Sequence, residues 1–217
     1  MFVMGKLMIT IIICVIIGYF FGCITTGYLV GKIKHKNIQQ EGSGNIGTTN
    51  ALRTMGVSAA LITFLGDICK AIVPSVVVRL IFREDYDLAY LFGICLGFGV
   101  VLGHNFPFWL KFKGGKGIAV TSAVVLALAD WRVIVIGLLL FIGIVAVTRY
   151  VSLGSLVVVW YLPVNTLLFY RQEKLFPVML LVSLFFTALA YIRHAPNIKR
   201  LIAGTERKLG EKAEENH

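Results

Sequence analysis

Apolar residues are arranged along this chain in long continuous runs, separated by short polar segments. The first run, Met8–Val30, has 23 residues, enough for a helix to cross roughly 30 Å of hydrocarbon at about 1.5 Å per residue. It has neither the shorter apolar core nor the Ala-x-Ala-like site of a cleaved signal peptide, so we expect a permanent span. Six further runs follow, at Val57–Ile81, Leu88–Leu102, Ile118–Ala129, Val133–Val147, Leu153–Tyr170 and Phe176–Tyr191. The pattern predicts an all-α, polytopic bundle of about seven transmembrane helices, forming a single membrane domain over residues 1–217.

One run is too short for this scheme. Ile118–Ala129 has 12 residues and would cover only about 18 Å as a helix. We expect it to extend back through the preceding glycines or to be half-buried. The alternative is a five-span bundle in which this run and a neighbouring run are partly re-entrant.

Composition excludes a soluble globular protein. The chain is 58% hydrophobic and 15% charged, whereas soluble domains have roughly 45–50% apolar and about 25% charged residues. The formal net charge of +10 would raise nucleic acid as a partner of a soluble protein, but here we attribute it to topology and expect no nucleic acid. Assigning the loops to alternate sides places 14 basic residues on one side and six on the other. The richer side should be cytoplasmic, which puts the N-terminus outside and the C-terminus inside.

Two features lie within the runs themselves. Asp67 and Lys70 are neighbours on one helix face, and ionisable residues at such depth are either paired or functional. A mutual ion pair and direct contact with a substrate remain equally open.

Glycines spaced four residues apart predict close approach of helix backbones. These pairs are Gly18 and Gly22, Gly27 and Gly31, Gly93 and Gly97, and Gly99 and Gly103.

The first polar loop, Glu41–Arg53, contains a literal Gly-x-Gly-x-x-Gly in Gly42–Gly47. A dinucleotide-binding fingerprint needs a preceding strand, and here both flanks are membrane spans. Glycines still let backbone N–H groups converge on an anion, and a helix starting near Thr49 would add its positive end. Arg53 can hold an oxyanion through two hydrogen bonds. Further donors are Ser43, Thr48, Thr49 and Asn50.

The second loop, Gly103–Gly117, combines aromatic residues with Gly-Gly-Lys-Gly at its end. The aromatic residues are typical of an interfacial belt at the level of the lipid headgroups. The glycines and lysines have the composition of a phosphate-binding loop, but Gly117 stands where a Walker A motif needs Ser or Thr. ATP hydrolysis is therefore not expected. The alternative is a basic loop resting on anionic lipid.

The third segment, Arg193–Glu206, follows the last run directly. Pro196 suits the first position of a helix, which would lie in the interface with an apolar stripe. His194 and Asn197 lie beside a basic cluster, at the level where the other two loops should converge. We expect both of them to belong to a site.

Familiar signatures of acyl transfer and of metal binding are absent from the sequence. It has no His-x-x-x-x-Asp acyltransferase pattern, no Gly-x-Ser-x-Gly elbow and no His or carboxylate cluster with metal-ligand spacing. We therefore expect neither a covalent acyl-enzyme, nor a catalytic metal, nor a cofactor.

The three loops together resemble a known family. Ser43–Asn50, Gly103–Gly117 and Arg193–Leu201 are similar to the three cytoplasmic motifs of the bacterial acyl-phosphate-dependent glycerol-3-phosphate acyltransferases. Ile46 and Thr48 depart from the commoner residues, at positions that we take as bystanders. The resemblance implies transfer of a fatty acyl group from a long-chain acyl phosphate to the sn-1 hydroxyl of glycerol 3-phosphate. It further implies release of lysophosphatidic acid and inorganic phosphate, within phospholipid synthesis.

The resemblance also implies a place and a set of site residues. The protein would be a multi-pass protein of the bacterial inner membrane, in contact with membrane lipid, with its active site facing the cytoplasm. The implied catalytic residues are Ser43, Arg53, Lys116, His194 and Asn197, and the implied substrate-binding residues are Gly44, Asn45, Thr49, Asn50, His104, Lys113, Gly114, Gly115, Gly117 and Ser152.

Roles can be assigned to several of these residues. Arg53 and Lys116 would neutralise phosphate, Gly114, Gly115 and Gly117 would supply a backbone cradle, and His194 with Asn197 would orient substrate. The resemblance implies that a substrate phosphate accepts the hydroxyl proton, with His194 as the alternative base.

Two other functions remain as alternatives. An anion or phosphate transporter would explain basic glycine loops, but it predicts an internal repeat and polar residues near the midplane. A non-catalytic scaffold at the lipid surface would leave the three oxyanion-like motifs unexplained.

Overall fold

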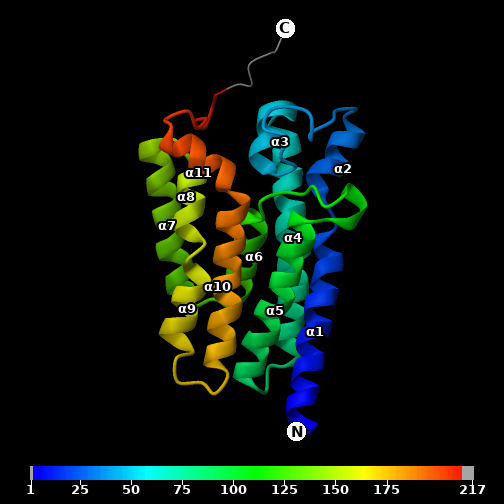
Figure 1. Ribbon diagram of the computed structural model, residues 1–217, viewed down its shortest axis with the longest axis vertical. Coiled ribbons are helices and arrows are strands. Elements are labelled where there is room, and N and C mark those ends of the chain that lie inside the picture. The colour runs from blue at the N-terminus through cyan, green and yellow to red at the C-terminus, as the bar shows by residue number, and fades with distance from the viewer. Residues whose placement is uncertain (1, 212–217) are drawn as a thin grey trace.

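The computed structural model describes residues 2–211, and within that range the chain is helical without any strand. Figure 1 shows the helices packed side by side in an elongated bundle. In chain order they are α1 (Phe2–Gly22), α2 (Thr26–Ile33), α3 (Thr48–Met55), α4 (Val57–Ile81), α5 (Tyr86–Asn105), α6 (Ile118–Leu128), α7 (Trp131–Thr148), α8 (Val151–Val158), α9 (Tyr161–Phe169), α10 (Phe176–Arg193) and α11 (Ala195–Ile202), with a short 3-10 turn, η1 (Phe108–Leu110), after α5.

Six segments of the described chain are long and apolar enough to cross a membrane. They coincide with six of the predicted runs, so the prediction of a multi-pass, all-helical membrane bundle is confirmed. The first segment consists of α1 and α2, and the fifth consists of α8 and α9. The six segments are Met4–Ile33, Val57–Ile81, Tyr86–Leu110, Trp131–Thr148, Val151–Phe169 and Phe176–Arg193.

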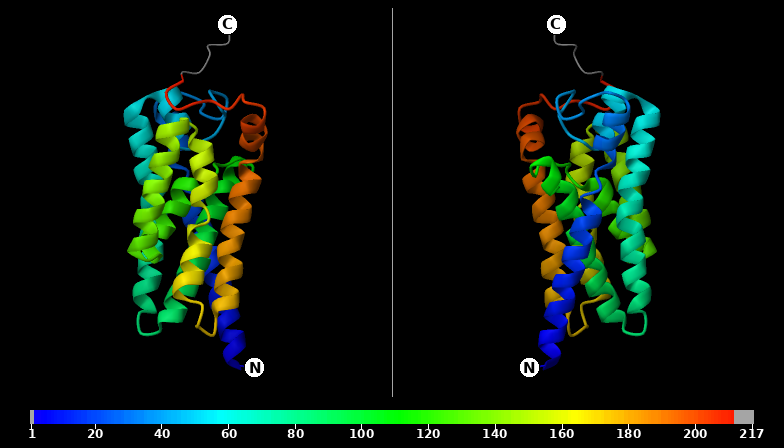
Figure 2. Two further views of the ribbon diagram at one scale, coloured as in Figure 1. Left: turned by 90° about the vertical axis from the view of Figure 1, so that its left-hand side faces the viewer. Right: turned by 90° about the vertical axis from the view of Figure 1, so that its right-hand side faces the viewer.

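The seventh run forms α6, which has 11 residues and covers only about 16 Å. We expected this helix to extend back through the preceding glycines, and it does not. Gly117 has a φ of 81°, in the left-handed region, so the helix begins only after it. In Figures 1 and 2 the α6–α7 turn lies part-way along the bundle, while the α4–α5 and α9–α10 connections lie at its far end. Helix α6 therefore does not traverse the bundle by itself. Its neighbours α5 and α7 both belong to segments long enough to cross a membrane, so the described residues hold six such segments, between the seven spans predicted and the five of the alternative.

Helix α5 is buried along most of its length and packs against α1 through glycines. A Cβ atom at Gly18 or Gly22 of α1 would collide with backbone carbonyls of α5, and one at Gly99 or Gly103 would collide with those of α1. The two backbones therefore lie in direct contact, as the glycine spacing predicted. The outward faces of α1 and α7 carry exposed large apolar side chains, as contact with lipid tails requires.

The polar loops gather at one end of the bundle. Helices α2, α3 and α11 and the segment that follows α11 all lie there, whereas α1 begins at the opposite end (Figures 1 and 2). We call this the polar end. Lys212, counted with the cytoplasmic basic residues, lies outside the described residues.

Candidate active site

A cavity of about 1060 Å³ opens at the polar end and continues between the helices. This volume lies just above the roughly 300–1,000 Å³ typical of small-molecule sites. The polar part, here called the chamber, is lined by Ser43, Gly44, Asn45, Thr48, Thr49, Arg53, Gly114, Lys116, Gly117, Ser152, His194, Asn197, Arg200 and Glu206. The apolar part, here called the groove, is lined by Phe64, Ile68, Val125, Leu126, Ile134, Gly137, Leu138, Phe141, Val145, Val158 and Tyr161.

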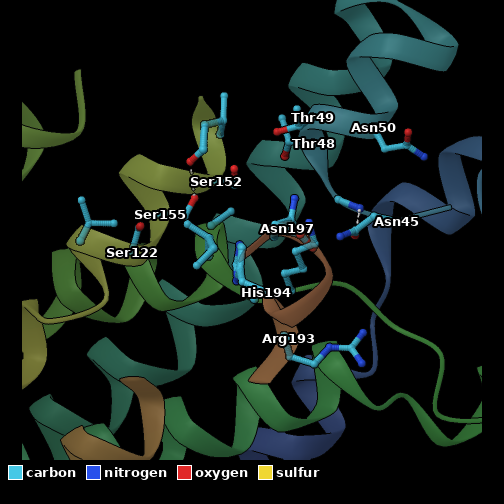
Figure 3. A pocket seen from close by; sticks show the side chains of 18 of the residues that line it. Asn45, Thr48, Thr49, Asn50, Ser122, Ser152, Ser155, Arg193, His194 and Asn197 are labelled. Atoms are coloured by element: carbon cyan, nitrogen blue, oxygen red, sulfur yellow. Dashed lines mark hydrogen bonds between the residues drawn. The ribbon is translucent and has the colours of Figure 1, made fainter. Parts of the chain in front are cut away.

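Four helices direct their N-termini at the chamber. The first turn of each of these helices contributes to its lining, through Thr48 and Thr49 of α3, Ile118 and Ala119 of α6, Val151 and Ser152 of α8, and Pro196 and Asn197 of α11. Figure 3 labels Thr48, Thr49, Ser152 and Asn197 among them. In the described chain, none of these four N-termini is capped by a side-chain hydrogen bond. Helices α5 and α7 are capped by Asp85 and Asp130, whereas α2, α4, α9 and α10 also lack a side-chain cap among the described residues. What distinguishes the four chamber helices is that the first turn of each lines the cavity. Uncapped helix N-termini present free N–H groups and partial positive charge, so the chamber has the construction of an anion site.

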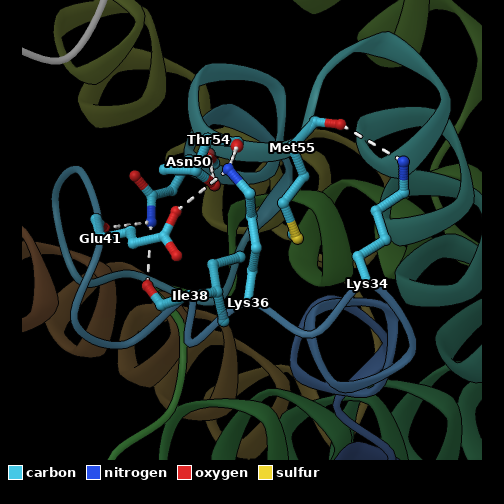
Figure 4. A network of polar contacts seen from close by, with 7 residues as sticks. All are labelled: Lys34, Lys36, Ile38, Glu41, Asn50, Thr54 and Met55. Atoms are coloured by element: carbon cyan, nitrogen blue, oxygen red, sulfur yellow. Dashed lines mark hydrogen bonds and ion pairs between the residues drawn. The ribbon is translucent and has the colours of Figure 1, made fainter.

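The first loop is shaped by the Asn50 side chain, which is 2% exposed. Its amide oxygen accepts from the Ser43 N–H at 2.9 Å, and its amide nitrogen donates to the carbonyls of Ile38 and Glu41 at 3.2 and 3.0 Å (Figure 4). A Cβ at Gly42, where φ is 60°, would collide with the same amide. Asn50, predicted to bind substrate, therefore holds the loop in shape beside the chamber.

Two lysines attach the other end of α3 to the chain before it. Lys34 Nζ lies 3.5 Å from the carbonyl oxygen of Met55, and Lys36 Nζ lies 2.8 Å from that of Thr54 (Figure 4). Cations at a helix C-terminus complement its negative end. They fix α3 with its positive end directed at the chamber.

The second loop is tied down by its own backbone and by Arg193. The N–H groups of Gly114 and Gly115 donate to the carbonyls of Asn105 and His104 at 3.1 and 3.0 Å. The Arg193 guanidinium donates to the carbonyls of both glycines at 2.9–3.1 Å and lies over the Phe106 ring. The predicted cradle is corrected here, because both glycine N–H groups are used within the loop.

A chain of charged and amide groups crosses the chamber. Lys116 Nζ donates to the amide oxygen of Asn197 at 2.5 Å, and the amide nitrogen of Asn197 donates to Glu206 at 2.5 Å. Arg200 Nε donates to the other Glu206 oxygen at 2.7 Å. Burial would raise the Glu206 pKa, but the hydrogen bonds outweigh it and hold the pKa below its usual value. Burial, with help from nearby arginines, lowers the pKa of Lys116 to about 8.

His194 lies at the junction of α10 and α11, facing Asn197 in the chamber (Figure 3). Its Nδ1 is 2.8 Å from the carbonyl oxygen of Ala190, so Nδ1 carries the proton and Nε2 is left as an acceptor. Burial and the Lys116 charge lower the pKa of His194 to about 4. The imidazole is therefore neutral near pH 7.

Beneath the chamber lies a buried group of three ionisable residues. Lys70 Nζ is 2.8 Å from Asp67 Oδ1 and 2.8 Å from His104 Nδ1, and it also donates to the carbonyl of Ile24. The ion pair considered from the sequence is thus present. Asp67 and His104 also line the cavity, where the chamber passes into the groove.

Most predicted site residues line the cavity, from both loops, α8 and the α10–α11 junction. Two do not: Lys113 is exposed, and Gly115 packs against the His104 ring. Sequence reasoning missed Glu206 and Arg200, and it left Thr48 out of the site residues although it named Thr48 as a donor of the first loop. Thr48, taken as a bystander, has a buried hydroxyl for which the described residues offer no hydrogen-bond partner. Its place in the first turn of α3 was the available signal.

Comparison with known proteins agrees with this geometry. The family model described as glycerol-3-phosphate acyltransferase matches residues 12–204. A glycerol-3-phosphate acyltransferase of Clostridioides difficile is 40% identical over 94% of this chain and 97% of its own length. One of Shouchella clausii is 36% identical over 95% of this chain and 99% of its own.

Two crystal structures are similar in fold and sequence. They are those of an integral membrane glycerol 3-phosphate acyltransferase in its glycerol 3-phosphate form and in its lysophosphatidic acid form. Their TM-scores are 0.79 and 0.77, each with 32% identity over 92% of this chain and 96% and 95% of theirs. The chain therefore belongs to the glycerol-3-phosphate acyltransferase family.

Proposed function

We propose that this protein transfers the acyl group of a long-chain acyl phosphate to the sn-1 hydroxyl of glycerol 3-phosphate, giving lysophosphatidic acid and inorganic phosphate. The observation that carries the proposal is the continuity of the cavity, in which an anion-binding chamber leads directly into an apolar groove. A phosphorylated lipid substrate needs both parts. A small phosphorylated alcohol needs only the first.

The phosphate groups are held by cations and by helix N-termini. Arg53 and Lys116 neutralise charge in the chamber, and the uncapped N-termini of α3, α6, α8 and α11 supply backbone donors. In this proposal the N–H groups of these helix N-termini bind phosphate, the role that the sequence analysis assigned to the backbone of Gly114 and Gly115. Gly117 keeps part of that role, because it directly precedes α6.

The reaction depends mainly on positioning the glycerol hydroxyl against the acyl carbon, because the carboxylic–phosphoric anhydride of the acyl phosphate is already activated. The glycerol hydroxyl oxygen forms a bond to the acyl carbon, and the bond from that carbon to the phosphate oxygen breaks. Donors directed at the chamber stabilise the oxyanion and the departing phosphate. The hydroxyl proton passes to a substrate phosphate. The low pKa of His194 makes it a weak base and favours an orienting role beside Asn197.

The membrane supplies the lipid substrate from the side. Leu126 and Leu138 line the groove and are 48% and 56% exposed, so the groove opens on the lipid-facing surface. We place the polar end in the cytoplasm of a bacterial cell and the bundle in its inner membrane. The excess of basic residues in the loops at this end supports that orientation.

Phosphate release tests the proposal directly. Purified protein in detergent is given palmitoyl phosphate, with and without glycerol 3-phosphate, and released phosphate and lysophosphatidic acid are both measured. We expect release that depends on glycerol 3-phosphate and matches the lipid product. Folded protein that releases nothing under either condition would contradict the proposal, and uptake of phosphate by liposomes would then test transport.

A further inference from the structure

The groove opens sideways to lipid, but away from the polar end it stops near the α6–α7 turn. We call this end its floor, and its lining residues there are Leu126, Ile134 and Tyr161. The Asp130 N–H in this turn donates to the side-chain oxygen of Asn165 in α9 at 2.9 Å. Figure 1 shows the start of α9 beside the lower end of α7, and these two helices are in contact. The turn that stops part-way along the bundle is thus fastened to the opposite wall of the groove.

The groove has a definite length. Helix α7 lines it from Val145 near the polar end to Ile134 near the turn, an advance of about 16 Å at 1.5 Å per residue. Tyr161 at the start of α9 and Leu126 on α6 are the lining residues farthest from the polar end on their own helices. A chain in the groove therefore meets its floor well before it spans the roughly 30 Å of hydrocarbon.

Tyr161 is the largest side chain at this floor, and shape alone holds it in place. A Cβ atom at Gly137 of α7 would collide with the end of the Tyr161 ring, so the absence of a side chain there admits the ring. The Tyr161 hydroxyl is buried, and none of the residues that the structure describes is its hydrogen-bond partner. Buried tyrosine hydroxyls usually have a hydrogen-bond partner. Since this one has none among the described residues, we attribute the role of Tyr161 to the space that its ring fills.

We propose that Tyr161, seated against Gly137, sets the length of acyl chain that the protein accepts. The inference rests on the proposed acyl phosphate donor and adds the residue that limits it. The end of the chain packs against the ring when the carboxyl carbon lies in the chamber. A smaller side chain at this position lengthens the groove, and a larger one shortens it. Each methylene gained or lost from the buried part of the chain changes kcat/KM about fourfold, equivalent to about 0.8 kcal/mol.

A chain-length profile tests the proposal. The kcat/KM of the wild type, Tyr161→Ala and Tyr161→Trp is measured with lauroyl, myristoyl, palmitoyl and stearoyl phosphate at saturating glycerol 3-phosphate. We expect Tyr161→Ala to move the optimum at least one step toward longer chains, and Tyr161→Trp at least one step toward shorter chains. Tyr161→Phe keeps the ring and removes only the hydroxyl, so its profile should match the wild type.

A variant at a second position of the groove keeps the proposal testable if the Tyr161 variants do not fold. Ile134→Trp fills the groove from α7 and should shift the optimum in the same direction as Tyr161→Trp. Leu139→Trp, at a 64% exposed position on the lipid side of α7, should leave the profile unchanged. If folded variants at both groove positions keep the wild-type profile, or lose activity equally at every length, the chain-length proposal is overturned while the transferase stands. If the wild type forms no lysophosphatidic acid from any donor, the proposed function itself fails.

Discussion

The chamber and the groove are two ends of one cavity, built by different means. The chamber depends on particular atoms: four uncapped helix N-termini, and cations that are each held by a hydrogen-bonded partner. The groove depends on shape: the faces of α4, α6, α7 and α8, one glycine, and a turn that stops within the bundle. Changes in the chamber should therefore alter the rate. Changes in the groove should alter which chain reacts.

The largest effect is expected where the two parts meet. Asp67→Asn removes the negative charge beside Lys70, whose side chain is only 3% exposed. A buried cation left without its counter-charge costs about 3–5 kcal/mol, so thermal unfolding in detergent should begin at a clearly lower temperature.

The double variant Asp67→Asn/Lys70→Met separates structure from substrate contact. It removes both charges, so we expect it to recover most of the lost stability and to keep activity within about tenfold of the wild type, a change of about 1.4 kcal/mol. Recovered stability with activity still lost would instead assign Asp67 or Lys70 to the substrate.

Within the chamber, two lysines of the same loop should behave differently. Lys116→Met removes a cation that lines the cavity and contacts Asn197, so kcat/KM should fall about 10²–10³-fold, as for loss of one preorganised donor. Lys113→Met removes an exposed cation outside the cavity lining, and its kcat/KM should stay near that of the wild type. Equal losses in the two variants would mean that the loop acts by charge alone.

The sequence predicts the chamber well because its residues come in short motifs. Ser43, Lys116 and Asn197 stand in three segments that flank spans on the same side, and the helical architecture brings them together. The sequence does not show which polar groups form hydrogen bonds within the loops and are therefore not available to a substrate. Asn50 and the N–H groups of Gly114 and Gly115 are taken up by hydrogen bonds inside the loops, and only the folded geometry reveals this.

The groove is hardly predictable from the sequence. Leu138 lines it while the adjacent Leu139 faces lipid, and both satisfy the same requirement for an apolar residue. Gly137 and Tyr161 lie on different helices with no motif around them. The bounds of α6, by contrast, could be predicted, because the apolar run from Ile118 coincides with the helix; what the run does not show is which of its side chains line the groove.

The pH dependence of kcat/KM should follow Lys116. Its pKa of about 8, lowered by burial, leaves it about nine-tenths protonated at pH 7. Above about pH 8 the free protein loses this charge, and kcat/KM should fall about tenfold per pH unit, since kcat/KM reports ionisations of the free enzyme. Lys116→Arg keeps its charge, so its profile should stay level up to about pH 10. A fall at the same pH in this variant would assign the ionisation to another group.

The smallest effect is expected at His194. A general base contributes about 10²–10⁴-fold, whereas we expect an orienting group to contribute about tenfold. With a pKa of about 4, His194 is neutral from about pH 5 upward and produces no inflection there. His194→Gln can still donate to the Ala190 carbonyl and place an acceptor in the chamber, so kcat should fall about tenfold with the shape of the pH profile unchanged. Single-turnover rates of the wild type and of His194→Gln, measured from about pH 5 upward, distinguish a base from an orienting group. A loss of about 10²-fold or more would make His194 the base, and a loss near tenfold leaves the hydroxyl proton to the substrate phosphate.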